Sequence, residues 1–310
     1  MSHDVVVALD VGGTSMKGAL CTRDGHVTHL ERRGTQGFGD HADLVEAVVA
    51  CAADLVEIGQ ATYGSVVAVG LTVAGVVDVT RGVAVSSMML GWRQVPFVAL
   101  LSRRTGLPVG FGHDVQTAAY AEGIRGAARG CRDYLYLSLG TGVGSTMVFD
   151  SDIYLGATGL GGELAHFVVE PEGPPCRCGK FGCLEMVASA DAVGRRYQEL
   201  HPGGGYFSAQ DVVDRVRAGE PAARGVWNRA VVALGRAIAT YVEILEPERV
   251  VVGGGMSAAG ADLFDPLNAL VATGVSRLRV APVIPAGLGA LAGIHGAALR
   301  AWERAGEADR

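Results

Sequence analysis

The chain has 310 residues, of which 49% are hydrophobic and 6% aromatic, and its formal net charge is −6 at pH 7. This length suits two domains better than a single hydrophobic core, and 46 glycines among so few aromatic residues favour an α/β protein with many tight turns. The acidic balance argues against binding to nucleic acid. Because no signal peptide and no apolar run of membrane-spanning length is found, we expect a cytoplasmic protein without a membrane partner.

The first elements that the sequence predicts are a hairpin, a helix and a buried strand. An apolar run at 5–11 meets Gly12-Gly13-Thr14 and then a second apolar-rich run at 16–22, and a Gly-Gly pair between two such runs is a hairpin signal. The apolar spacing over 43–60 is typical of a helix. The unbroken apolar character of 65–71 is typical of a buried strand.

The strand-turn-strand pattern returns later in the chain. Residues 73–85 are expected to form a hairpin punctuated by glycines, and the Ala-rich segment 114–125 a helix. Residues 134–139 then alternate and run into Gly140–Gly144, and a further apolar-rich run follows at 145–149. Because the two hairpins lie about 130 residues apart, they predict two similar domains that face each other across a cleft.

The last third of the chain predicts helices around one strand. Residues 222–245 have a long helical pattern, 249–252 form a strand, and Gly253–Gly255 lead toward another helix. The Ala-rich segment 289–304 predicts a final helix. The segment His201–Tyr206 is the most loop-like stretch and is expected at the surface.

Two glycine turns are candidates for nucleotide binding. The exposed N–H groups of such turns bind anions, and a carboxylate beside them suits a hydrated Mg²⁺. Neither turn is a P-loop or a Rossmann motif, and each one alone is more often only a hairpin. Two turns in matched positions, together with Gly253–Gly255, favour a nucleotide. The candidate nucleotide-binding residues are Asp10, Gly12, Gly13, Thr14, Lys17, Gly140, Thr141, Gly142, Gly254 and Gly255.

A cluster of possible metal ligands lies within eighteen residues: His166, Cys176, Cys178 and Cys183. Three thiolates and one imidazole form a ligand set of closed tetrahedral zinc sites. The spacing C-x-C-x₄-C is not the common finger or ribbon spacing, so three ordinary thiols in a Pro/Gly loop remain the alternative. A structural zinc would hold in place Glu163 and Glu185 at the two ends of the loop.

This loop also carries a family motif. The pattern G-E-x-x-H followed by C-x-C-G-x-x-G-C-x-E closely resembles the signature of the ROK family (repressors, open reading frames and sugar kinases). The glycine turns resemble the phosphate and adenosine segments of the actin, sugar kinase and heat-shock ATPase superfamily. The resemblance implies a two-domain α/β fold of the actin-like ATPase (ribonuclease H-like) type with an interdomain cleft. It further implies a structural Zn²⁺ on His166, Cys176, Cys178 and Cys183, and a sugar facing Glu163, His166 and Glu185.

The same resemblance gives Asp114 a role. In the sugar kinases of this family an Asn-Asp pair opens a helix, and the Asp accepts the proton of the hydroxyl that attacks the γ-phosphate. Here the pair is His113-Asp114, so the resemblance implies that Asp114 is the general base and that Gly75 and His113 lie at the substrate. From the residues alone, Asp114 could equally be only a helix cap.

The sequence departs from the family pattern around the expected sugar site. His113 replaces the usual Asn, Met89 stands where glucose-type members read Asn in A-P-N-L-G-W, and Ala74 replaces a proline. A site built to hydrogen-bond a hydroxyl discriminates against ligands that lack it, so an exchange of Asn for Met implies a different ligand face or a weaker one. The departures therefore bear on the identity of the sugar and leave the expected phosphoryl transfer intact.

The resemblance implies an ATP-dependent kinase with catalytic Mg²⁺ that phosphorylates the primary hydroxyl of a hexose-like sugar, and a homodimer or homotetramer is expected. The small domain is expected at 1–112 with the C-terminal helix 293–310, and the large domain at 113–292 with the zinc loop and the nucleotide-binding segments. The alternative within enzymes is a kinase of a non-glucose polyol such as an N-acylhexosamine or a C7-cyclitol.

Two non-enzymatic functions are alternatives to a kinase. A ROK transcriptional regulator carries a helix-turn-helix domain before the first phosphate segment, whereas nine residues precede Asp10 here and the net charge is acidic. The other is a sugar sensor without turnover, and the retention of Asp10 and Asp114 argues against it.

Overall fold

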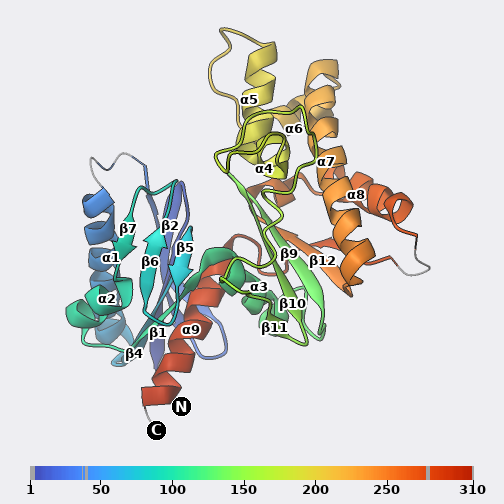
Figure 1. Cartoon of the computed structure of the whole chain (residues 1–310). Helices are drawn as coiled ribbons and strands as arrows, with labels where there is room; N and C mark the ends of the chain where they lie inside the picture. The colour runs from blue at the N-terminus through green and yellow to red at the C-terminus, as the bar shows by residue number, and fades with distance from the viewer. Residues whose placement is uncertain (1–3, 37, 39–40, 277–279, 309–310) are drawn as a thin grey trace. The chain divides into compact units, whose positions relative to one another are not determined.

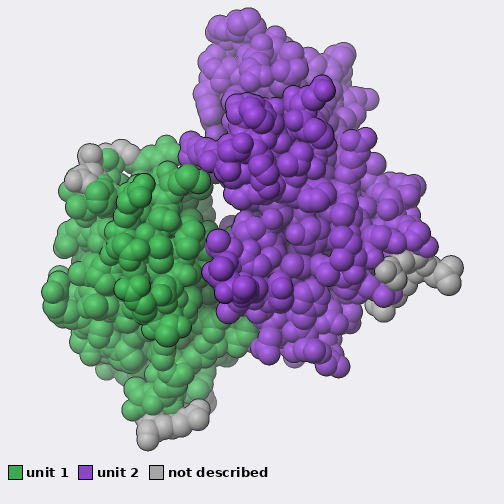
Figure 2. Space-filling view, viewed as in Figure 1, with its two compact units in different colours: residues 1–121, 291–310 green, residues 122–290 purple. Residues whose placement is uncertain are grey.

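The computed structural model describes residues 4–36, 38, 41–276 and 280–308. The chain divides into two compact units, residues 1–121 with 291–310 (unit 1) and residues 122–290 (unit 2), which Figure 2 colours separately. The domain boundaries expected at 112/113 and 292/293 stay a prediction, because compactness alone does not show that a unit folds independently. In the described part of the chain, no helix is long and apolar enough to cross a membrane.

A five-stranded mixed sheet with the order β3-β2-β1-β4-β8 forms the centre of unit 1 (Figure 1). Strand β1 pairs antiparallel with β2 and parallel with β4, and β4 pairs parallel with β8. This pairing confirms the predicted first hairpin and the predicted buried strand. The strands are β1 (Val5–Val11), β2 (Ser15–Thr22), β3 (Val27–Gly34), β4 (Val66–Val73) and β8 (Val109–His113).

Helices cover both faces of this sheet because successive side chains of β1 point to opposite sides. Val7 packs in the apolar cluster that includes α1 and α2, whereas Val6 packs against α9. A Cβ at Gly70 of β4 would lie 1.9 Å from the Ala297 carbonyl oxygen, so glycine lets α9 approach the sheet closely. The helices are α1 (His41–Tyr63), α2 (Phe97–Thr105) and α9 (Ala292–Ala308), and α9 follows the short 3₁₀ helix η2 (Gly289–Leu291).

Two further elements of unit 1 carry candidate site residues. A small antiparallel sheet contains β5 (Val76–Asp78), β6 (Val83–Ser86) and β7 (Arg93–Val95), and its first pair confirms the hairpin predicted at 73–85. Helix α3 (Asp114–Arg125) begins directly after β8 with the bounds that the sequence predicts, and its last four residues belong to unit 2.

Unit 2 contains a second five-stranded mixed sheet, with the order β11-β10-β9-β12-β13. Strand β9 pairs antiparallel with β10 and parallel with β12, which confirms the second predicted hairpin. The strands are β9 (Tyr134–Leu139), β10 (Val143–Phe149), β11 (Asp152–Ile153), β12 (Arg249–Gly253) and β13 (Val283–Pro285). The helices are α4 (Leu184–Ala188), α5 (Ala190–Leu200), α6 (Ala209–Arg217), α7 (Pro221–Leu245), η1 (Gly255–Ala259) and α8 (Ala261–Gly274).

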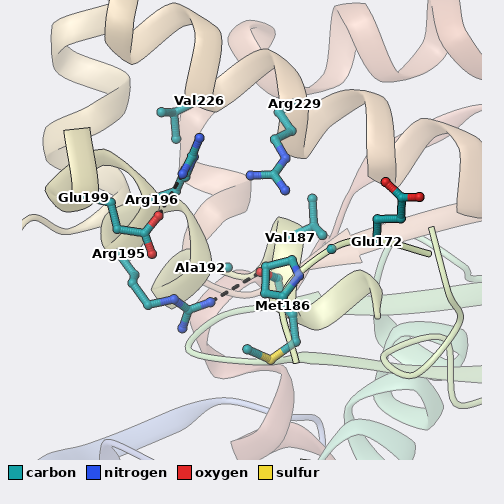
Figure 3. Close-up of a pocket in the computed structure, with 11 residues that line it drawn as sticks. Glu172, Met186, Val187, Ala192, Arg195, Arg196, Glu199, Val226 and Arg229 are labelled. Atoms are coloured by element: carbon teal, nitrogen blue, oxygen red, sulfur yellow. Dashed lines mark hydrogen bonds and ion pairs between the residues drawn. The ribbon is translucent and has the colours of Figure 1, made fainter. Parts of the chain in front are cut away.

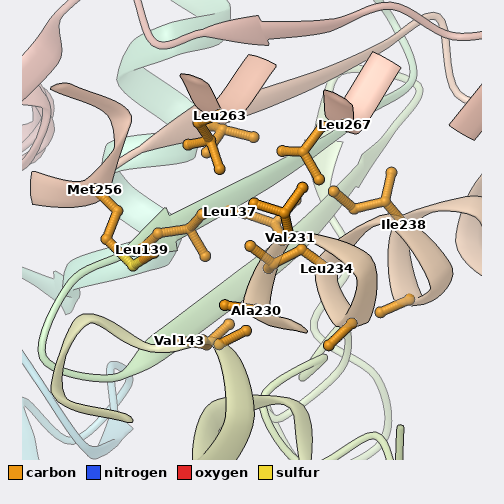
Figure 4. Close-up of a cluster of buried hydrophobic side chains, with 14 of the residues drawn as sticks. Leu137, Leu139, Val143, Ala230, Val231, Leu234, Ile238, Met256, Leu263 and Leu267 are labelled. Carbon is orange, nitrogen blue, oxygen red and sulfur yellow. The ribbon is translucent and has the colours of Figure 1, made fainter. Parts of the chain in front are cut away.

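The long helix α7 supplies much of the core of unit 2. Its side chains Val231 and Leu234 pack on Leu137 and Leu139 of β9 and on Leu263 of α8 (Figure 4). A fully buried leucine contributes about 1.5–3 kcal/mol to stability relative to an exposed one. The cluster therefore fixes the end of β9, where the second glycine turn begins.

Candidate active site

Asp10 forms an enclosed ion pair in unit 1. It lies on β1 opposite Lys17 on β2, and Lys17 Nζ donates a hydrogen bond to Asp10 Oδ2 at 2.8 Å. Asp10 is 9% exposed, and this burial raises the pKa of its carboxyl above the ordinary 3.8 while Lys17 opposes the shift. Gly293 at the start of α9 faces the carboxylate, since a Cβ there would lie 2.4 Å from Asp10 Cγ. The carboxylate is thus held between an ammonium group and a helix backbone.

The turn after β1 is fixed on one side by Thr35. The Gly12 carbonyl accepts a hydrogen bond from Thr35 Oγ1 at 3.2 Å, and the Thr14 carbonyl accepts one from the Thr35 N–H at 3.1 Å. Among the described residues, the amides of Gly13 and Thr14 have no acceptor. Two N–H groups of the turn are therefore available to an anion, as its pattern predicts.

Met89 packs on this same turn. A Cβ at Gly13 would lie 2.0 Å from Met89 Cε, so the methyl group of Met89 rests where the side chain of a larger residue would stand. Met89 is 47% exposed. The sequence predicts this residue near the sugar; its contact with the glycine turn adds a neighbour that the sequence does not reveal.

Asp114 opens α3, but it is not a standard N-cap. Its Oδ1 accepts the N–H of the next residue, Val115, at 2.8 Å, whereas a capping side chain bonds two or three residues further on. His113 Nδ1 lies 3.4 Å from the same oxygen, and the exposed fractions of the two side chains are 15% and 24%. The Asp114 charge also contributes to the raised pKa of Asp10, which places the two carboxylates in one electrostatic environment.

Gly75 is required for steric reasons. Its φ is +120°, and a Cβ there would lie 2.4 Å from the carbonyl oxygen of Ser86 on β6. Gly75 thus lets the chain after β4 pass close to the strand that leads to Met89. The structure does not give Gly75 a direct role beyond this close approach.

The second glycine turn joins β9 to β10 in unit 2 and is tied to Glu185. Glu185 Oε2 accepts the N–H of Val143 at 3.2 Å, and a Cβ at Gly142 would lie 2.5 Å from the same oxygen. Gly254, with φ +82°, packs on the carbonyl oxygen of Leu139 at the end of β9. Within unit 2 the structure therefore brings a predicted sugar ligand together with one predicted phosphate segment, and the predicted adenosine segment packs on the end of β9. Thr141 lies on the same turn, and Gly255 begins η1 directly after Gly254.

Ser145, which the sequence analysis missed, fixes the backbone around Glu163. Its buried Oγ donates to the Gly162 carbonyl at 2.6 Å and accepts the N–H of Leu164 at 2.6 Å. Glu163 itself is half-buried, and its charge adds to the burial that raises the pKa of Tyr241 on α7. No sequence signal marks Ser145, because its partners lie seventeen and nineteen residues away.

The four predicted metal ligands converge. The ligand atoms of His166, Cys176, Cys178 and Cys183 all lie within 4.8 Å of one another. Cys176 Sγ is 3.5 Å from His166 Nδ1, and Cys178 Sγ is 3.6 Å from Cys183 Sγ. A tetrahedral zinc with Zn–S bonds of about 2.3 Å places its sulfur ligands roughly 3.8 Å apart, so both the donor types and their separation fit the ion.

The thiols of this cluster differ in acidity. Hydrogen bonding, first of all from the Lys180 backbone, lowers the pKa of the exposed Cys178, whereas burial and the neighbouring thiols raise the pKa of Cys183 to about 12. Without a cation nearby, the Cys183 thiol therefore resists ionisation. A divalent metal would remove that resistance, because it binds the thiolate form.

Comparisons with known proteins identify the family of this chain. A profile of the ROK family matches residues 6–304. The chain is 34% identical to a glucokinase of Thermotoga maritima over 97% of this chain and 98% of that protein, and 28% identical to an N-acetylmannosamine kinase of Pasteurella multocida over 82% of each. A crystal structure of a ROK family glucokinase from Streptomyces griseus in complex with glucose and AMPPNP is 27% identical, with a TM-score of 0.84 over 96% of this chain and 99% of that one. This chain therefore belongs to the ROK family and has its α/β actin-like ATPase fold.

Proposed function

We propose that this chain is a kinase that transfers the γ-phosphoryl group of ATP to the primary hydroxyl of a hexose. The observation that carries the proposal is the placement of Asp114, whose partly exposed carboxylate opens α3 and shares an electrostatic environment with Asp10. The likeness to a glucokinase over nearly the whole length of both chains supports the same reaction.

Asp114 acts as the general base. Its Oδ1 is held by the Val115 N–H, which leaves Oδ2 for the sugar hydroxyl. As the bond from the hydroxyl oxygen to the γ-phosphorus forms, the proton passes to Asp114 and the bond to ADP breaks. A positioned base of this kind contributes about 10²–10⁴-fold to the rate.

The glycine turns and the ion pair of Asp10 bind the nucleotide phosphates. Each unit by itself offers N–H donors for phosphate oxygens: Gly13 and Thr14 in unit 1, and Thr141 and Gly142 in unit 2, where the Gly140 N–H instead donates to the Gly142 carbonyl. Asp10 would hold a hydrated Mg²⁺, which would offset the negative charge of the triphosphate. Lys17 Nζ, which donates to Asp10 in this structure, could donate to a phosphate oxygen instead.

The sugar hydroxyls are bound by Glu163, His166 and Glu185, and the zinc site holds their loop. Because His166 Nδ1 faces Cys176 Sγ, Nδ1 would hold the metal and Nε2 would remain for a sugar hydroxyl. A closed zinc site with four protein ligands has no position for a substrate, so its role is structural.

A kinase of a non-glucose polyol is the second candidate. His113 and Met89 favour it, since an imidazole can replace one hydrogen bond of an amide whereas a thioether barely can. The likeness to an N-acetylmannosamine kinase supports an N-acylhexosamine as such a substrate.

A panel of sugars and cyclitols, assayed for ATP consumption with the purified protein, tests both candidates. Asp114→Asn keeps the size of the side chain and removes the proton acceptor, so turnover on the best sugar should fall by roughly 10² or more while nucleotide affinity changes far less. Near-normal turnover of this variant would mean that the base lies elsewhere. No ATP consumption with any polyol would favour a sugar sensor. The homodimer or homotetramer and the cytoplasmic location stay predictions, of which light scattering tests the first.

A further inference from the structure

A pocket of about 430 Å³ lies in unit 2 beside the segment that carries the three cysteines, residues 176–183, which we call the cysteine loop (Figure 3). Residues 172–174, which precede this loop, form one wall of the pocket, and α4, α5 and α7 form the others. Three arginines, Arg195, Arg196 and Arg229, line it, and we call it the arginine pocket. Its size falls in the range of small-molecule sites, and the residues assigned to phosphoryl transfer do not line it.

The three guanidinium groups differ in their partners. Arg229 Nε donates to Glu170 Oε1 at 2.9 Å, and its Nη2 donates to the other oxygen of the same carboxylate. Arg196 pairs with Glu199 at 2.9 Å. Arg195 donates only to the Met186 carbonyl, at 3.3 Å, so among the described residues it has no carboxylate partner. One positive charge of the pocket is therefore not offset by an ion pair.

The Arg229–Glu170 pair connects the pocket to the cysteine loop. The Glu170 N–H donates to the Gly182 carbonyl at 3.2 Å, and the Glu170 carbonyl accepts the Gly173 N–H at 2.8 Å. Gly182, with φ +64°, packs so closely on Glu170 that a Cβ would lie 1.4 Å from its carbonyl oxygen. Because Gly182 precedes Cys183, Arg229 holds through Glu170 a backbone segment that positions a proposed zinc ligand.

We propose that the arginine pocket binds a sugar monophosphate, and that the bound phosphate competes with Glu170 for Arg229 and loosens the cysteine loop. A guanidinium group binds phosphate oxygens with the same fork that it offers to a carboxylate, and Arg195 supplies the second donor. The lining residues Glu172 and Glu199 disfavour a polyphosphate and can accept hydrogen bonds from sugar hydroxyls. The binding step stands apart from the proposed function. Only its effect on turnover, a lower rate at high product concentration, rests on that function.

Calorimetric titration of the full chain without nucleotide tests the binding step, with glucose 6-phosphate, inorganic phosphate and glucose as separate probes. Glucose 6-phosphate should bind saturably and glucose should not bind at this site. Arg195→Ala should weaken the binding of glucose 6-phosphate by about tenfold, because a charge-assisted hydrogen bond is lost. The control is Arg224→Ala, which removes an exposed arginine that lies on α7, a helix that also lines the pocket, but that is not among the lining residues; it should leave the affinity within about twofold.

Glu170→Gln tests the competition, since it removes the charge that holds Arg229. We expect glucose 6-phosphate to bind about threefold or more tightly to this variant. In the unmodified protein, hydrogen exchange at the amides of residues 176–183 should become faster when the ligand binds. Both readouts are independent of turnover, so they separate this proposal from the assignment of the kinase reaction.

Three results would overturn the proposal. Absence of saturable binding of glucose 6-phosphate removes the site. Equal affinity for inorganic phosphate and glucose 6-phosphate shows a phosphate site without a sugar pocket, and an unchanged affinity in Arg195→Ala places the ligand elsewhere. If Glu170→Gln binds no more tightly and the exchange rates do not change, the competition with Glu170 is wrong.

Discussion

Gly293 offers a sharp test of the enclosed Asp10 carboxylate. In the substitution Gly293→Ala, the new Cβ would lie 2.4 Å from Asp10 Cγ and 2.5 and 2.7 Å from its two oxygens, whereas an ordinary contact begins at 3.4 Å. The carboxylate must therefore move by about 1 Å or α9 must retreat from the sheet, and overpacking of this kind costs about 1–3 kcal/mol. Alanine in a helix is about 0.5–1 kcal/mol more favourable than glycine, so the free energy of unfolding should fall by roughly 0–2.5 kcal/mol.

The matched control is Gly306→Ala in the same helix α9. No atom lies within 4 Å of a Cβ at Gly306, so this variant should gain the full helix propensity, about 0.5–1 kcal/mol. Urea unfolding compares the two variants. A misplacement of about 1 Å in a catalytic group costs up to 10²-fold in rate, so Gly293→Ala should also lose one to two decades of kcat, and Gly306→Ala should lose none. If both variants were equally stable and equally active, the proposed packing of Gly293 on Asp10 would be wrong.

Three further predictions follow from the site. The purified protein should contain about one zinc per chain by metal analysis, and Cys178→Ala should lower both the zinc content and the sugar affinity. A zinc content well under half an equivalent, in protein never exposed to a chelator, would contradict the zinc site. The double variant His113→Asn with Met89→Asn should raise kcat/KM for glucose by about one to two decades, because one hydrogen bond to a buried hydroxyl contributes roughly 1–3 kcal/mol. A clear preference of the unmodified protein for glucose over all other polyols would count against this role of His113 and Met89. Asp10, whose pKa burial raises above 3.8, makes the free energy of unfolding decline as the pH rises through that value, because the unfolded chain releases the proton first. Asp10→Asn should remove this decline in urea unfolding above pH 3.8, and an unchanged pH profile would refute the raised pKa.

The sequence predicts the parts of the fold that rest on local patterns. The two hairpins follow from apolar runs that flank glycine turns, α3 follows from an Ala-rich segment, and α7 follows from helical spacing. The sequence does not predict strand β8, because Gly110 and Gly112 interrupt the apolar pattern of this five-residue segment. These glycines are needed for contacts far along the chain, since a Cβ at Gly110 would lie 2.2 Å from the Arg300 carbonyl oxygen on α9.

The candidate site also contains residues that the sequence predicts and residues that only the folded structure reveals. The cysteine cluster can be read from spacing, because its four ligands lie close in the chain and the residue types are rare. Thr35, Ser145 and Gly293 cannot, since each acts through a backbone or carboxylate contact that only the folded chain creates. Met89 shows an intermediate case: a motif locates it near the ligand, but its flexible thioether takes a position on Gly13 that no pattern specifies.

The position of α9 has a consequence for how the chain folds as it leaves the ribosome. One face of the sheet in unit 1 is covered mainly by this helix, through Ile294, Ala297, Ala298 and Ala301, and α3 adds a contact of Thr117 with Thr72 of β4. The first part of unit 1 ends at residue 121 and the second begins at residue 291. At about 5–20 residues per second, roughly 10–30 s pass before the covering helix is made. During this interval the nascent sheet exposes an apolar face, which is the kind of surface that chaperones bind, and the segment translated first becomes the last to be completed.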